Sequence, residues 1–164
     1  MRSRVIAGVA ALATVAAFAA CGSDSTTTVD PTPTVTYTSQ LSAANEKPNA
    51  NSSTATGLAT YTLKGNSLSF VVTVYGLTGP ATASHIHVGA ASATGGVIVP
   101  FVTGSVQSGN LTAGTIDLST TVSNGTSTIT GDSLKVLLNN GNAYTNVHTS
   151  ANGGGEIRGQ IIKQ

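Results

Sequence analysis

The sequence is poor in cysteine, aromatic residues and charge. Its 164 residues include one cysteine, no tryptophan and three histidines. The single cysteine, Cys21, excludes an intrachain disulfide and a cluster of thiolate metal ligands. Charged residues make up only 8% of the chain, and the formal net charge is +1. The chain therefore lacks the basic surface that nucleic-acid-binding proteins need, and we expect no nucleic-acid partner.

The residues that are abundant favour short strands joined by tight turns. Glycine alone occurs 19 times, and Ser, Thr, Asn, Ala and Val make up much of the rest. Apolar side chains alternate with period two from residue 35 onward, most clearly in the hairpin pattern LATYTLKGNSLSFVVTVYGL. We therefore predict an all-β domain over residues 35–164, an antiparallel β-sandwich of the immunoglobulin or superoxide-dismutase type.

One segment departs from the strand pattern. In TGDSLKVLLNNG, three leucines recur at helical spacing after Asp132, which is a candidate N-cap. Asn140 and Gly141 follow as residues that end helices. The sequence therefore predicts one short helix over residues 132–139.

The N-terminus has the pattern of a targeting segment. Two arginines precede an apolar, alanine-rich run, which is typical of a secretory signal peptide over residues 1–20. The run ends at Cys21, and FAAC resembles the lipobox at which bacterial lipoproteins are lipidated. Residues 21–34 are rich in Ser, Thr and Pro, as expected of a disordered tether. We therefore expect a lipid anchor at Cys21 that holds the domain outside the cytoplasm, with the outer membrane or cell surface favoured.

All three histidines fall on predicted strands. Alternate residues of a strand point to the same side, so His85 and His87 project together from SHIHV. The same alternation places His148 on the polar side of its strand and Glu156 with Arg158 on the polar side of the last one. The last hairpin therefore has a polar face that carries His148, Glu156 and Arg158 together with Tyr144, Asn146 and Gln160. If the strand of His85 and His87 lies beside this hairpin, the three imidazoles and the carboxylate converge.

Three interpretations of this polar face remain open. His85, His87 and His148 are suited to hold copper or zinc, with Glu156 or water completing the site. Alternatively, the histidines bond loop carbonyls, while Glu156 pairs with His148 and Arg158 in a purely structural polar network. The third interpretation is a site for an organic ligand.

Several motifs resemble one known family. The segments LSAANEKPN, ASHIHVGAASATGGVIVPF and NAYTNVHTSANGGGEIRGQI are similar to those of the CHRD domain, which is named after chordin. The resemblance spans about residues 36–164, and it implies a β-sandwich in an extracytoplasmic protein. The family pattern that the chain resembles includes Asn45 and Glu46 in addition to the residues of the polar face. The chain departs from the family pattern at Lys47, where an aliphatic residue is common.

A more distant resemblance is to copper/zinc superoxide dismutase, in which an H-x-H strand and a later histidine ligate copper. His85, His87 and His148 would correspond to those ligands, but the zinc loop, the disulfide and a fourth histidine are absent from this sequence. We therefore expect a lipid-anchored module without enzymatic activity that binds a metal, an extracellular protein or a matrix component. The alternative is a mononuclear copper redox protein.

Overall fold

A computed structural model describes residues 32–101 and 104–164. The predicted signal peptide, the lipidation site Cys21 and the tether up to residue 31 lie outside these residues. The first strand begins at Thr34, one residue before the predicted start of the domain. No helix in the described ranges is long and apolar enough to span a membrane.

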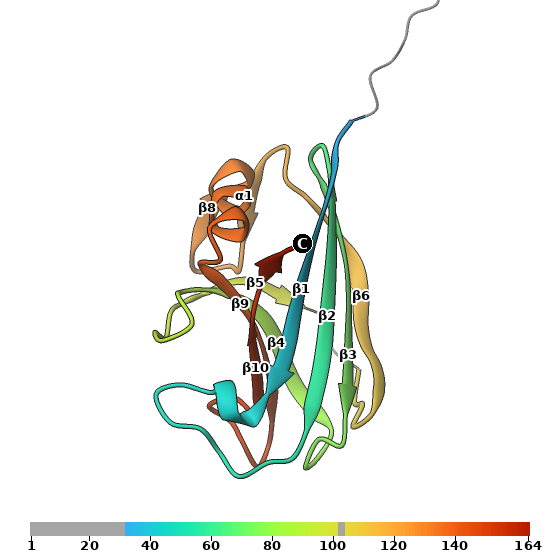
Figure 1. Ribbon diagram of the computed structural model, residues 1–164, viewed down its shortest axis with the longest axis vertical. Helices are drawn as coiled ribbons and strands as arrows, with labels where there is room; N and C mark the ends of the chain where they lie inside the picture. The colour runs from blue at the N-terminus through green and yellow to red at the C-terminus, as the bar shows by residue number, and fades with distance from the viewer. Residues whose placement is uncertain (1–31, 102–103) are drawn as a thin grey trace, which may run out of the picture. The chain divides into compact units, whose positions relative to one another are not determined.

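The described residues form an all-β fold with one α-helix, as the sequence predicts (Figure 1). All strand pairs are antiparallel, and the main sheet has the order β5-β4-β9-β10-β1-β2-β3-β6, with β11 also paired to β1. The elements are β1 (Thr34–Ser42), η1 (Ala43–Asn45), β2 (Thr56–Lys64), β3 (Ser67–Tyr75), β4 (Ala81–Val88), β5 (Val97–Phe101), β6 (Gly109–Asp117), β7 (Thr121–Ser123), β8 (Thr128–Thr130), α1 (Gly131–Asn139), β9 (Ala143–Thr149), β10 (Ile157–Gln160) and β11 (Ile162–Lys163).

The long sheet folds over into two layers. Figure 1 shows β1, β2, β3 and β6 in one layer and β4, β9 and β10 in the other. β5, at one end of the sheet, approaches β3, the strand next to the other end, where the rings of Phe70 and Phe101 stack with centroids 4.4 Å apart. The alternating apolar residues of both layers meet between them and form the core, which includes Tyr37, Ala59, Tyr61, Leu68, Val72, Val74, Ile86, Val147 and Ile157.

Local sequence explains the two clearest features of the sheet. The predicted hairpin is confirmed: Leu63 in β2 pairs with Leu68 in β3, and Gly65 takes the positive φ of +60° that the tight turn requires. Pro100 lies in β5, which is the edge strand of the sheet order. This position agrees with prediction, because proline cannot donate a ladder hydrogen bond.

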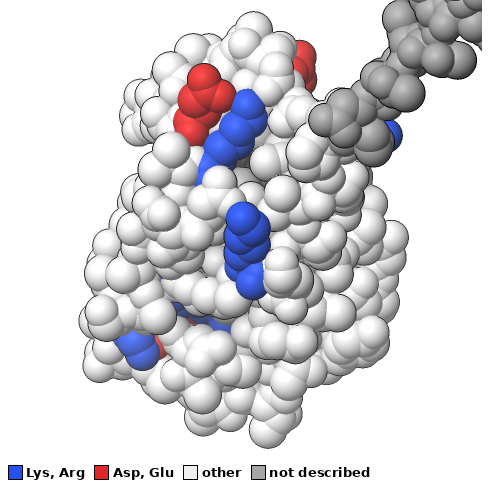
Figure 2. All heavy atoms as spheres, turned by 45° about the horizontal axis from the view of Figure 1, so that its top comes forward, with Lys and Arg blue, Asp and Glu red and all other residues white. Residues whose placement is uncertain are grey.

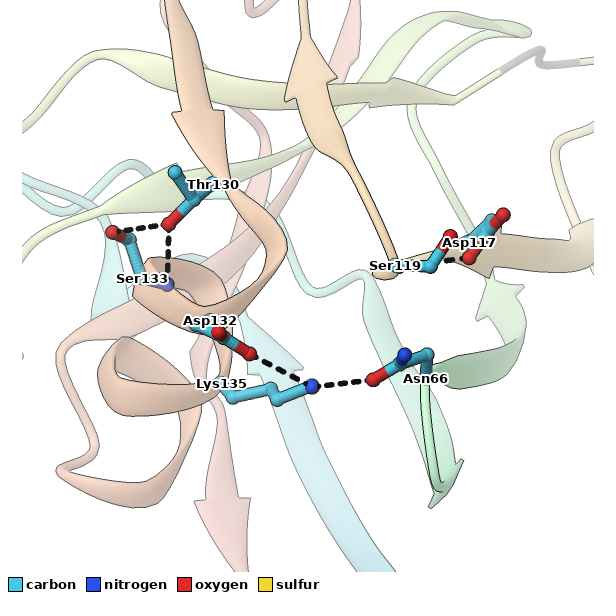
Figure 3. A network of polar contacts seen from close by, with 7 residues as sticks. All are labelled: Asn66, Asp117, Ser119, Thr130, Asp132, Ser133 and Lys135. Atoms are coloured by element: carbon cyan, nitrogen blue, oxygen red, sulfur yellow. Dashed lines mark hydrogen bonds and ion pairs between the residues drawn. The ribbon is translucent and has the colours of Figure 1, made fainter.

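The predicted helix is present as α1, but its N-cap differs from the prediction. The Thr130 side chain accepts a hydrogen bond from the backbone N–H of Ser133 at 3.1 Å (Figure 3). Asp132 instead lies in the first turn, where its carboxylate pairs with Lys135 at 3.0 Å. Threonine and aspartate are both good N-cap residues, and Thr130 and Asp132 lie only two positions apart. The structure uses the earlier of the two as the cap.

Charged side chains are sparse on the folded surface. Figure 2 shows a few charged side chains, some of them acidic and basic neighbours, among wide uncharged areas on one face of the molecule. This face carries no basic patch of the kind that binds nucleic acid.

Candidate metal centre

Strand pairing brings the three histidines together on the side of β4 and β9 that faces away from the core. In the register between these strands, His87 is opposite Tyr144, His85 is opposite Asn146, and His148 is opposite Ala83. One ring nitrogen from each histidine lies within 4.8 Å of the others. The predicted convergence of His85, His87 and His148 is therefore present in the structure.

Backbone carbonyls fix the proton position on two of the rings. Nδ1 of His87 is 2.9 Å from the Gly95 carbonyl oxygen, and Nδ1 of His148 is 3.1 Å from that of Gly153. A carbonyl oxygen only accepts, so each Nδ1 must carry the hydrogen. In the neutral rings this leaves Nε2 of His87 and of His148 as bare lone pairs. Metal-binding histidines are commonly oriented in this way, with the other ring nitrogen donating to a carbonyl.

The His85 ring is hydrogen-bonded to the His148 ring. Nδ1 of His85 lies 3.3 Å from Nε2 of His148. Because that Nε2 carries no hydrogen, His85 is the donor in this bond. The spacing is also the distance of about 3.3 Å that separates two nitrogen ligands of a tetrahedral zinc ion. A metal ion bound by Nδ1 of His85 and Nε2 of His148 would take the place of the hydrogen between them. His85 would then carry its hydrogen on Nε2.

Tyr144 and Arg158 form a rigid support beside His87. The Tyr144 ring stacks on His87 with centroids 4.8 Å apart, and the Arg158 guanidinium carbon lies 3.5 Å from the centroid of the same ring. Because β9 lies between β4 and β10, the histidine and the arginine approach Tyr144 from opposite sides. The stack limits how far His87 can turn.

The loop of residues 89–96 covers this support. Arg158 donates to the carbonyl oxygens of Ala90 and Ala93 at 3.0 and 2.7 Å. Gln160 donates to the Gly89 carbonyl oxygen at 2.8 Å. Tyr144 and Arg158 are consequently only 3% and 2% exposed, although the sequence places them on an outward-facing side. The polar face is thus a buried layer under loops, and the three histidines lie half-buried within it.

Gly95 is required for the loop to reach His87. A Cβ at this position would overlap the Val88 carbonyl oxygen, whereas a Cβ at Gly96 meets nothing within 4 Å. We expect Gly95→Ala to displace the loop and to lower the free energy of unfolding by about 2 kcal/mol. The matched Gly96→Ala change should stay within about 0.5 kcal/mol of the parent. Equal urea midpoints for the two variants would contradict this account of the loop.

Burial keeps the three imidazoles neutral. It lowers the pKa of each ring, and in His85 the neighbouring His148 and His87 contribute further, lowering the pKa to about 4. Neutral imidazole is the form that binds a metal ion.

These pKa shifts predict how pH changes the stability of the metal-free protein. The unfolded chain binds protons on its histidines near pH 6.5, whereas folded His85 resists protonation until about pH 4. The unfolded state therefore binds more protons below about pH 6.5. The free energy of unfolding consequently decreases as the pH is lowered through that range. Urea unfolding between about pH 7 and about pH 5 should show this fall, and His85→Asn should reduce it. An identical pH profile for the variant would show that His85 does not contribute.

Glu156 is not part of the histidine cluster, which corrects the prediction that it faces the same side. It lies before the first residue of β10, next to Gly155 with its positive φ of +133°, so strand alternation does not extend to it. Its buried carboxylate accepts hydrogen bonds from the Ser53 and Thr149 hydroxyls and from both the N–H and the hydroxyl of Thr78, at 2.6–2.8 Å. It therefore pairs with neither His148 nor Arg158.

The hydrogen bonds of Glu156 also set its ionisation. Burial alone would raise the pKa of Glu156, but the bonds from Thr149, Ser53 and Thr78 outweigh burial and lower it. The carboxylate is therefore charged at neutral pH, and its role in the structure is to join three loops.

The carboxylate that does approach the polar face is Glu46, which follows η1. Its oxygens each accept a hydrogen bond from Nδ2 of Asn146 at 3.1 Å. Burial raises the pKa of Glu46, while the bond from Asn146 and the charge of Arg158 oppose that shift. Glu46 thus supports Asn146, and it is not one of the three residues that make up the candidate ligand group.

The sequence analysis missed the carbonyl groups that orient the histidines. Every residue has a backbone carbonyl, so no residue type marks the contributions of Gly95 and Gly153. The glycine-rich loops gave the only available signal, since glycine permits the close approach seen at Gly95. The contact of Glu46 with Asn146 spans 100 residues of sequence, and a single chain carries no pattern that would reveal it.

The structure thus defines an antiparallel β-domain with a buried polar layer and three clustered imidazoles. The CHRD domain model matches residues 37–161, and the chain therefore belongs to the CHRD domain family. No curated protein and no solved structure matches the chain. The family resemblance seen in the sequence is confirmed, whereas the more distant resemblance to superoxide dismutase stays a prediction.

Proposed function

We propose that this protein is a cell-envelope CHRD-domain lipoprotein whose domain binds one copper or zinc ion through His85, His87 and His148. Membership of the CHRD family supports a binding module. The metal assignment rests on the histidine cluster, and the membrane anchor rests on the N-terminal sequence and Cys21.

One observation carries the metal assignment. Nε2 of His87 is buried and has no hydrogen-bond partner, while its Nδ1 is held by Gly95. Buried polar atoms are nearly always paired, so an unpaired lone pair inside a cluster of imidazoles needs a further explanation. A metal ion at the centre of the cluster would supply the missing partner.

The geometry and chemistry of the donor set fit copper or zinc. Imidazole nitrogen is a preferred ligand for both ions, and the cluster contains no sulfur ligand. His85 and His148 already have the spacing of two tetrahedral ligands. Ligand nitrogens of the group lie up to 4.8 Å apart. To reach the tetrahedral spacing, the most widely separated pair would have to approach each other by about 1.5 Å.

Metal titration of the purified full-length protein tests this proposal. After treatment with a chelator, the protein should bind one equivalent of zinc or copper in a calorimetric titration at neutral pH. The triple variant His85→Ala, His87→Ala, His148→Ala should lose that equivalent. Equal binding by the triple variant would overturn the metal assignment and leave the polar network as a structural feature.

The anchor is tested separately. Cys21→Ser should move the protein from the membrane fraction to the soluble extracytoplasmic fraction, and unchanged fractionation would contradict lipidation. We propose an extracellular protein or a matrix component as the macromolecular partner of the anchored domain. The copper redox function stays a prediction of the sequence.

A further inference from the structure

We propose that the metal centre keeps one coordination position for a small anion from solution, so that the loaded protein binds oxygen- or nitrogen-donor anions directly at the metal. This inference rests on the proposed metal binding and names the class of ligand that the same site would take.

The first argument is the number of protein ligands. Among the described residues, the candidate ligand group consists of His85, His87 and His148 and includes no carboxylate. The two buried glutamates are committed elsewhere, Glu46 to Asn146 and Glu156 to Ser53, Thr78 and Thr149. A zinc ion takes four ligands, and sites with three protein ligands leave the fourth position to water or an exogenous group. The centre therefore has the coordination of an open site.

The second argument is charge. Three neutral imidazoles bring no negative charge, so a divalent ion held by them keeps its full charge. Arg158 adds a buried positive charge on the far side of Tyr144. Although no ion pair within 4 Å joins it to an acidic side chain of the described residues, the Glu46 carboxylate is near enough to interact with that charge. Glu46, which follows η1, is the acidic group that faces this layer, and it lies on the Asn146 side, where its two oxygens accept hydrogen bonds from Asn146. The positive charge at the site therefore comes mainly from the metal ion itself. A site of this kind favours an anion over a neutral fourth ligand.

The third argument is access. Tyr144, Asn146 and Arg158 are at most 4% exposed, and the loops seal them from solvent. The three histidines, by contrast, are each partly exposed. Because Nε2 of His87 is itself buried, a small anion would reach the metal from the side of His85 and His148, at the margin of the buried layer.

Azide is a suitable probe, because its binding to copper(II) gives an optical charge-transfer band. Full-length protein loaded with one equivalent of copper(II) should develop this band on titration, and the band should saturate at one azide per copper. The electron paramagnetic resonance spectrum should shift over the same concentration range. The metal-free protein should show neither change. Gel filtration afterwards should recover the copper with the protein, which shows that azide has not removed the metal.

A matched variant separates direct coordination from general charge attraction. Lys64→Gln removes one positive charge at the exposed end of β2, and it should leave the azide affinity within about twofold of the parent. If copper binds through the three histidines but azide alters neither spectrum, the open position is disproved while the proposed function stands. If the chelator-treated protein binds no copper, both proposals fail.

Discussion

Replacing His148 by alanine is expected to lower the affinity for zinc by at least about 100-fold. Structural zinc sites with four protein ligands have binding free energies of about 10–16 kcal/mol, so one ligand contributes roughly 3 kcal/mol. A loss of that size corresponds to an affinity change of about 100-fold. His148 is held at both ring nitrogens, because its Nε2 accepts the hydrogen bond of His85 and its Nδ1 donates to the Gly153 carbonyl oxygen. Calorimetry with a competing chelator measures the change.

A surface carboxylate provides the control for this experiment. Asp132 is an exposed acidic residue paired with Lys135, and it belongs to a different part of the fold. Asp132→Ala should leave zinc affinity unchanged within about twofold. If His148→Ala and Asp132→Ala lower the affinity equally, the metal binds to scattered surface groups and the cluster is not its site.

Replacing Glu156 by alanine is expected to cause the largest loss of stability, about 3 to 5 kcal/mol. The substitution removes a carboxylate that accepts four hydrogen bonds, and it leaves the donors at Ser53, Thr78 and Thr149 without a partner. Each unpaired buried donor costs roughly 1 to 3 kcal/mol, with part of this cost recovered by relaxation. Urea unfolding with linear extrapolation measures the loss.

Two further variants make this result interpretable. Glu156→Gln keeps one acceptor oxygen and should show an intermediate loss, which remains measurable if the alanine variant does not fold. Asp132→Asn removes the same charge from an exposed ion pair and should change stability by no more than about 0.5 kcal/mol. A loss below about 1 kcal/mol for Glu156→Ala would show that the four hydrogen bonds do not hold the loops together.

The sequence predicts the fold well because the signal is local. Period-two alternation identifies which side of each strand enters the core, as with Tyr61 and Val72, and the turn at Gly65 fixes the hairpin. The same rule correctly places His85 and His87 on one side of β4. Local rules do not determine which strands become neighbours, and the meeting of β4 with β9 follows from the sheet order alone.

The part of the site that could not be predicted depends on loops. Glu156 is displaced from the expected face because a glycine with positive φ interrupts the alternation one residue before it. Arg158 is buried because the loop of residues 89–96 folds over it and supplies two carbonyl oxygens. Contacts of this kind involve backbone groups and distant segments, and neither has a characteristic residue pattern.

The ring protonation of the histidines is the most direct test of the central claim that backbone carbonyls orient the imidazoles toward one metal ion. Proton–nitrogen correlation spectra of the metal-free protein above about pH 7 should show His87 and His148 protonated on Nδ1. Adding one equivalent of zinc should shift the Nε2 signals of these two rings and leave their Nδ1 protons in place. Protonation on Nε2 in the metal-free protein, or spectra that zinc does not change, would contradict the account.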